Sequence, residues 1–197
     1  MTTVDLWNVY QNLQILVEKR QWSKIPEFAD KVEFDKKMRL SNYVTIVGKN
    51  RMEVDEVIIL TSEMSNIPNH SKDFKSAVKE FVERGKHFNI MIISSRVLTN
   101  KIREYAMSTG IRVTSYDYRI FVIDVTNAPL VPKHRILSQP EVAELLNHIL
   151  KPKESLPKIL INDPQVVWLG AVVGEVIEIE RPSEVTGTTM IYRIVVK

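Results

Sequence analysis

The chain has 197 residues, of which 44% are hydrophobic and 26% charged, and its formal net charge is +3. This composition is typical of a folded chain of one average domain or two small ones. It contains no apolar run near the roughly 20 residues that span a bilayer. The chain has no cysteine and its four histidines are far apart, so the sequence predicts neither a disulfide nor a metal site, and no cofactor is expected.

Residues 1–128 alternate between helical and strand patterns. Apolar residues at three- and four-residue spacing predict an opening helix, for which Thr3 is available as the N-cap. Strands that alternate with helices favour an α/β domain with a mixed sheet and flanking helices. The predicted elements are helices from Leu6, at Pro26 and over Glu33–Arg39, strands over Tyr43–Val47 and Val54–Leu60, a helix from Ser71 to Gly85, a strand over Phe88–Ile93, a helix over Leu98–Ala106, and strands over Ile111–Ser115 and Phe121–Val125.

The pattern changes at Asn127-Ala128-Pro129, a turn-forming cluster that predicts a boundary between domains 1–128 and 129–197. After it, Ser138 with Glu141 three residues later has the form of a capping box, which starts a helix. The predicted elements of this small α+β domain are a helix with the stripe Val142, Leu145, Leu146 and Ile149, a strand over Lys158–Ile161, a helical turn at Asp163-Pro164, and a β-hairpin of Val176–Arg181 and Thr188–Val196 joined by Pro182–Gly187.

The positive charge lies in the first domain. Residues 1–128 hold 19 Lys and Arg against 16 Asp and Glu, whereas residues 129–197 hold eight of each. A surplus of three permits a phosphate contact without requiring one.

The sequence lacks the common catalytic motifs. Gly48-Lys49-Asn50 has the Gly-Lys of a phosphate-binding loop without its first glycine or its Ser/Thr, and no nucleophile elbow or zinc-protease motif occurs. Two acid-x-lysine triplets, Asp35–Lys37 and Asp73–Lys75, leave a metal-dependent nuclease open as an alternative. Both fall in predicted helices, whereas two-metal chemistry needs carboxylates that converge from strand ends.

A series of motifs in the last 70 residues carries a family resemblance. In order along the chain they are Leu130-Val131-Pro132-Lys133-His134, Leu137-Ser138, Glu141-Val142, Glu144-Leu145-Leu146, Leu156-Pro157-Lys158-Ile159, Asp163-Pro164, Gly170, Gly174, Val176, Arg181-Pro182-Ser183-Glu184, Gly187 and Tyr192-Arg193-Ile194-Val195. In this order and spacing they resemble the assembly domain of the fifth-largest subunit shared by RNA polymerases of eukaryotic type. A small archaeal RNA polymerase subunit consists of this domain almost alone. The layout of residues 1–128 resembles the jaw domain of the eukaryotic-type family.

The resemblance implies a non-catalytic subunit of a multisubunit RNA polymerase. Residues 129–197 would anchor on the largest subunit, and residues 1–128 would form part of the lower jaw near downstream DNA. The implied partners are the largest and other polymerase subunits, duplex DNA without sequence preference, and transcription factors, with no membrane. The residues implied in docking are Pro132, His134, Arg181, Pro182, Ser183, Glu184, Tyr192 and Arg193.

Each docking motif also has a purely structural interpretation. Pro182 can end a strand, Gly187 can supply positive φ in the hairpin loop, and Tyr192 and Arg193 face opposite sides of a strand, one towards a core and one towards the surface.

The jaw domain of the family has a loop after its central strand that reaches towards downstream duplex. In this chain that loop corresponds to Ser94–Lys101, where Thr99-Asn100-Lys101 replaces the family's usual Thr-Pro-Ser. The resemblance implies DNA contacts from Arg96, Thr99, Asn100 and Lys101, since a strand-to-helix turn with basic residues suits an anion. The alternative is an ordinary capped turn.

The sequence departs from the family pattern at several positions. Ala128 replaces a usual histidine, Val172-Val173 replaces a common basic pair, and Glu178 and Glu180 stand where lysine or apolar residues are common. The docking surface is therefore less basic than usual, which suggests a divergent branch with its own partner, such as a polymerase encoded by a large DNA virus. The expected location is the nucleus for a cellular protein, or host cytoplasm and virion for a viral one. A regulatory adaptor outside the polymerase is a further alternative.

Overall fold

A computed structural model describes residues 5–22, 28–41, 43–49, 54–61, 88–94, 108, 112–183, 185 and 187–197. The chain divides into two compact units, residues 1–123 and 124–197, and each is described by itself. The turn-forming cluster at Asn127-Ala128-Pro129 belongs to the start of the second unit. None of the helices in these described ranges is long and apolar enough to cross a membrane.

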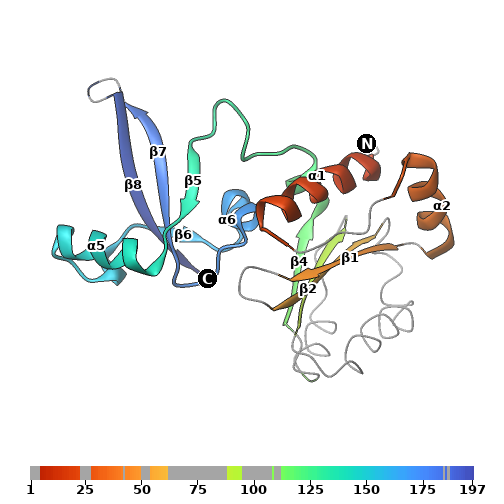
Figure 1. The fold of residues 1–197 in the computed structure, drawn as a ribbon, viewed down its shortest axis with the longest axis horizontal. Coiled ribbons are helices and arrows are strands. Elements are labelled where there is room, and N and C mark those ends of the chain that lie inside the picture. Colours follow the sequence, from red (N-terminus) through yellow and green to blue (C-terminus); the bar gives the residue numbers. More distant parts are fainter. Residues whose placement is uncertain are drawn as a thin grey trace. The chain divides into compact units, whose positions relative to one another are not determined.

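The first unit is built on a mixed four-stranded sheet in the order β1-β2-β3-β4. Strands β1 and β2 are antiparallel, while β2, β3 and β4 are parallel (Figure 1). The two central strands are continuous apolar runs, as expected of parallel strands that are buried on both faces. The mixed sheet is as predicted. The elements are α1 (Leu6–Lys19), α2 (Lys31–Ser41), β1 (Tyr43–Lys49), β2 (Asp55–Thr61), β3 (Phe88–Ser94), β4 (Arg112–Asp117) and the 3₁₀ turn η1 (Tyr118–Phe121).

The first helix begins where the apolar spacing predicts, but its N-cap is Asp5. The Asp5 carboxylate accepts a hydrogen bond of 3.1 Å from the backbone N–H of Trp7, while Thr3 lies outside the described residues. An aromatic cluster of Trp7, Tyr10, Phe28 and Phe34 then joins α1 to α2, with ring centroids between 5.1 and 5.7 Å apart. The helix predicted over Glu33–Arg39 is mostly exposed, and its buried residues Phe34 and Met38 attach it to the rest of the unit.

The strand predicted over Phe121–Val125 is wrong, because this stretch forms η1 and a following turn. The Asp117 side chain caps the 3₁₀ turn by accepting from the N–H of Arg119 at 2.8 Å. The Asn12 amide of α1 donates to the carbonyls of both Phe121 and Val122, at 2.9 and 2.8 Å. A helix side chain therefore binds the carbonyls that a strand ladder would have used. The helices predicted at Pro26, Ser71–Gly85 and Leu98–Ala106 lie outside the described residues.

The second unit holds a second mixed sheet, in the order β5-β7-β8-β6. Strand β7 is antiparallel to both β5 and β8, and β6 runs parallel to β8. The predicted hairpin and the helix with its capping box are confirmed, whereas β5 was not predicted. The elements are β5 (Lys133–Ile136), α5 (Gln139–Ile149), the 3₁₀ turn η2 (Lys153–Ser155), β6 (Lys158–Leu160), α6 (Pro164–Leu169), β7 (Val176–Ser183) and β8 (Gly187–Val196).

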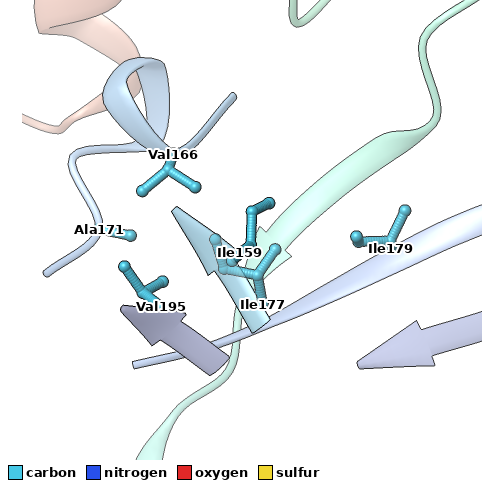
Figure 2. Packing of buried hydrophobic residues seen from close by; sticks show 6 residues of the cluster. All are labelled: Ile159, Val166, Ala171, Ile177, Ile179 and Val195. Carbon is cyan, nitrogen blue, oxygen red and sulfur yellow. The ribbon is translucent and has the colours of Figure 1, made fainter. Parts of the chain in front are cut away.

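Each face of this second sheet has its own apolar cluster. Figure 2 shows the cluster on the α6 face, formed by Ile159, Val166, Ala171, Ile177, Ile179 and Val195. On the other face, α5 contributes Val142, which packs with Leu137, Leu156, Val176 and Ile194. Neighbouring residues of β7 and β8 point to opposite faces, so the hairpin supplies side chains to both clusters.

A buried side-chain amide stabilises the start of the second unit. The Gln165 side chain of α6 is buried, and its Nε2 donates a hydrogen bond of 2.8 Å to the carbonyl of Val125. Asp124 stabilises the same turn by accepting from Thr126 and Asn127. Residues 124–128 therefore contribute to the second unit.

We expect a fragment of residues 124–197 to be more stable than one of residues 129–197, by about 1–3 kcal/mol, because the shorter fragment leaves a buried amide without its acceptor. Urea denaturation of the two fragments measures the difference. Gln165→Leu in both fragments is the matched control, since it removes the donor and should shrink the difference. Equal midpoints of the unsubstituted fragments would contradict the prediction.

Candidate docking surface of the second unit

The hairpin of β7 and β8 is longer than the strands beside it. Its register runs without interruption from Val176 opposite Ile194 to Ser183 opposite Gly187. Strand β5 pairs with β7 only as far as Glu180, and β6 pairs with β8 only over Ile194–Val196. The outer part of the hairpin, residues 181–183 and 187–189, is therefore a two-stranded ribbon that extends past its neighbours (Figure 1). We call this part the outer ribbon.

The predicted docking residues gather on this hairpin and on β5, but on both faces. Residues paired across strands share a face, and His134 is paired with Ile179, Arg181 with Thr189 and Arg193 with Ile177. These side chains, with that of Ser183, lie on the α6 face, whereas those of Pro182 and Tyr192 lie on the α5 face. Glu184 lies outside the described residues.

His134 and Arg193, both predicted docking residues, form hydrogen bonds within their own chain. The Nδ1 of His134 lies 2.7 Å from the carbonyl oxygen of Pro132, which can only accept, so Nδ1 carries the proton. The Arg193 guanidinium donates a bond of 3.0 Å from Nη1 to the carbonyl of Lys158 in β6. Arg181 and Pro182 are both exposed on the outer ribbon. Of the two predicted docking arginines, Arg181 is therefore the one that is available to another molecule without breaking a hydrogen bond within the chain.

Tyr192 has both an apolar and a polar environment. Its ring packs against the α5 cluster. Partial burial raises the pKa of its phenol, and the neighbouring Glu178 carboxylate raises it further. Tyr192 is opposite Glu178 in the register, so the hydroxyl remains a neutral donor beside a carboxylate. The prediction that one residue of the Tyr192-Arg193 pair faces a core agrees with this placement, and the positive φ predicted for Gly187 is confirmed at +74°.

An ion-pair network on the α5 face was not predicted from the sequence. The Arg135 guanidinium of β5 donates from Nη1 to Glu141 at 2.6 Å and from Nη2 to Glu178 at 2.8 Å. Arg135 thus connects β5 to β7 and to the first turn of α5. Arg135, Glu141 and Glu178 line an open pocket of about 320 Å³ together with Leu137, Glu144, Leu145, His148 and Tyr192.

The same network stabilises the start of α5. Glu141 accepts from both the hydroxyl and the backbone N–H of Ser138, each at 2.7 Å. These two bonds, and then the bond from Arg135, lower the pKa of Glu141 to about 2. The charged form of Glu141 therefore fixes the capping box and ties α5 to the sheet.

We expect Glu141→Gln to reduce the acid sensitivity of the second unit. Because the folded-state pKa of Glu141 lies below its usual 4.5, its contribution to stability is present above pH 4.5 and is lost as the pH falls towards 2. Denaturation at a series of pH values in this window should show a steeper fall for the wild type than for Glu141→Gln. Glu144→Gln is the control, since that carboxylate accepts no hydrogen bond from a described residue, and it should follow the wild type. Parallel curves for the wild type and Glu141→Gln would count against this role.

The other candidate sites of the sequence lie mostly outside the described residues. This is the case for the DNA-contact residues Arg96, Thr99, Asn100 and Lys101, and for the Asp73–Lys75 triplet. The Asp35–Lys37 triplet lies on α2, a helix as predicted. Within the ranges that the structure describes, no three His, Cys, Asp or Glu side chains are grouped so that they could hold a metal ion.

The comparison with protein families matches residues 123–195 to the family described as RNA polymerase Rpb5, C-terminal domain. This stretch coincides with the second unit. An archaeal relative, DNA-directed RNA polymerase subunit Rpo5 of Methanosarcina acetivorans, is 45% identical over 67 residues, which are 34% of this chain and 86% of the relative. The chain belongs to the Rpb5 family of DNA-directed RNA polymerase subunits.

Other members of the Rpb5 family match longer stretches of the chain. The RPB5 homolog of African swine fever virus is 29% identical over 136 residues, which are 65% of this chain and 66% of the viral protein. Subunit rpabc1 of RNA polymerases I, II and III from Dictyostelium discoideum is 33% identical over 95 residues, or 48% of each chain. The chain thus spans about two thirds of the length of its viral relative, and the Rpb5 relatives come from a virus, archaea and a eukaryote.

One residue that departs from the Rpb5 pattern forms an ion pair within the second unit. Glu178, which stands where lysine or apolar residues are common, accepts from Arg135 at 2.8 and 3.1 Å. Its charge is therefore balanced within the unit. Glu180 is exposed, and in the register it is opposite Lys133 of β5.

Proposed function

We propose that the protein works as a non-catalytic subunit of a multisubunit DNA-directed RNA polymerase, of the divergent type that large DNA viruses encode. The observation that carries the proposal is the match of residues 123–195 to the Rpb5 C-terminal domain, together with the compact second unit that the same residues form. The archaeal relative, most of which is matched by only 67 residues, supports an assembly role for this unit alone.

In this proposal the second unit is the assembly domain and docks on the largest subunit. The contact residues are Pro132, His134, Arg181, Pro182, Ser183, Glu184, Tyr192 and Arg193. A protruding hairpin with an exposed Arg181 at its outer end is suited to enter a groove on a partner. A charge pair that is desolvated in such a contact affects the binding affinity far more than a pair on an open surface.

The first unit, in the same proposal, is the jaw domain and lies near downstream DNA. Residues 1–123 hold 19 Lys and Arg against 15 Asp and Glu. In this proposal the cations Arg96 and Lys101, with Thr99 and Asn100 near them in the sequence, would contact phosphates. Phosphate contacts position a duplex but carry no sequence information.

The polymerase would be nuclear for a cellular chain, or act in host cytoplasm and be carried in the virion for a viral one. Transcription factors are further partners in this proposal.

We expect Arg181→Glu to weaken retention of the chain by the largest subunit at least tenfold, because a reversed charge is repelled in a partly desolvated contact. A pull-down of the largest subunit by tagged full-length chain measures the loss. Lys151→Glu makes the same change of charge at an exposed residue after α5 and should change retention little. Circular dichroism should first show that both variants fold. Equal retention of the two variants would contradict docking through Arg181.

We expect the double variant Arg96→Ala and Lys101→Ala to assemble normally but to hold downstream duplex less tightly, equally for unrelated sequences. The slope of log affinity against log salt should become shallower by about one per lost phosphate contact. Removal of two exposed cations of α2, Lys36→Ala with Arg39→Ala, is the matched control. An unchanged slope in the assembled enzyme would mean that the loop is only a turn.

A further inference from the structure

Hydrogen bonds fix the chain to the first unit as far as Val122. The Phe121 side chain is fully buried. The Asn12 amide donates to the carbonyls of Phe121 and Val122 at 2.9 and 2.8 Å, and the Asn8 amide donates to the same Val122 carbonyl at 3.3 Å. Because a carbonyl group is coplanar with the next peptide nitrogen, these bonds also fix the backbone nitrogen of Ile123.

A second set of hydrogen bonds fixes the chain to the second unit from Asp124 onwards. The Asp124 carboxylate accepts from the N–H and the hydroxyl of Thr126, at 3.0 and 2.6 Å, and from the side-chain amide of Asn127 at 2.8 Å. The N–H of Asn127 donates to the Asp124 carbonyl at 3.3 Å and closes the turn. The buried amide of Gln165 donates to the carbonyl of Val125 at 2.8 Å. These bonds attach the turn of residues 124–127 to α6.

Ile123 lies between these two sets of hydrogen bonds. Its side chain is 65% exposed, and it forms no hydrogen bond with a described residue. Isoleucine can adopt both the extended and the α-helical regions of backbone conformation, and neither burial nor a hydrogen bond restricts Ile123 to one of them. Known hinges consist of a few residues at the ends of elements that absorb a change in φ and ψ. Ile123 has this position, directly after η1 and its C-cap.

We propose that Ile123 is a hinge at which the two units change orientation independently of each other, and that the amides of Asn12 and Gln165 confine the motion to this residue. Each amide belongs to a helix that is anchored in the core of its own unit, α1 by Leu16 and α6 by Val166, both of which are fully buried. The boundary between the two compact units falls at the same place, between residues 123 and 124.

The hinge has a consequence for the proposed polymerase subunit, and this consequence alone rests on the proposed function. With the second unit docked, rotation at Ile123 would let the first unit follow the path of a duplex. Because the Asn12 and Gln165 amides fix the residues on either side, each unit would move as a rigid body and keep its internal geometry.

Pairs of spin labels in the free full-length chain test the hinge. The chain has no cysteine of its own, so labels attach only where cysteine is introduced. Lys36→Cys in α2 with Ala143→Cys in α5 measures distances between the units. Glu18→Cys with Lys36→Cys, and Ala143→Cys with Met190→Cys, each measure distances within one unit. All four positions are exposed.

We expect the distance distribution from double electron–electron resonance to be at least twice as wide between the units as within either of them. A distribution between the units that is as narrow as those within them would overturn the hinge. This comparison needs no substitution at Ile123 and therefore stands even if a hinge variant fails to fold.

Substitutions at the hinge and at one of the two amides then locate the motion. Ile123→Gly adds conformations with positive φ and should widen the distribution between the units at least 1.5-fold, whereas Ile123→Val keeps the β-branched side chain and should leave the width unchanged. Asn12→Ala releases the carbonyls of Phe121 and Val122 and should also widen the distribution. Gln11→Ala, at an exposed position of the same helix, is its control and should not.

The outcomes distinguish the hinge from the proposed function. Equal widths for Ile123→Gly and Ile123→Val would place the motion elsewhere and overturn the assignment to Ile123. Equal widths for Asn12→Ala and Gln11→Ala would overturn the role of the Asn12 amide. Circular dichroism should first show that each variant folds. All of these measurements use the free chain, so a failure here leaves the polymerase role standing, and a chain that no polymerase retains can still show the hinge.

Discussion

The unbroken register between β7 and β8 is the constraint on which the second unit depends. Because the register has no bulge, every second residue of each strand faces α6 and every other one faces α5. Two apolar clusters thus form on one hairpin. A shift of β7 by a single residue would bring Glu178 to the α6 face in place of Ile177 or Ile179, and the same shift of β8 would bring Arg193 to the α5 face in place of Ile194. The same constraint decides which backbone groups of the outer ribbon face outwards.

Arg135 adds a second level of organisation to this unit. It binds Glu141 at the start of α5 and Glu178 in β7, so the helix is attached to the sheet by charge as well as by its apolar stripe. The pairs are partly exposed, and each alone stabilises the unit little. Their value lies in geometry, since a planar guanidinium that binds two carboxylates orients the helix relative to the strands.

The sequence predicted local features better than features that depend on pairing between distant residues. The capping box of Ser138 and Glu141, the hairpin and the positive φ of Gly187 follow from short patterns and are confirmed. The strand at Phe121 was wrong because Asn12, more than 100 positions away, binds its carbonyls. The link from Arg135 to Glu178 spans 43 positions and depends on the register of β5, a short strand that no pattern predicted. The motifs gave the family correctly, but motif order does not show which sheet face a residue occupies. The alternation of β7 and β8 could have assigned Pro182 and Tyr192 to the face opposite Arg181.

Pro182 has a consequence for subunits that are made in excess over their partners. The carbonyl of Val176 accepts from Leu137 on the β5 side of β7, so by alternation the outward backbone position of β7 beyond Glu180 is Pro182. Proline has no N–H to donate, and another chain cannot pair along this edge of the outer ribbon. Filament growth through this ribbon needs two complementary edges on each molecule, and Pro182 leaves one. Free copies of the chain therefore do not form filaments through the outer ribbon.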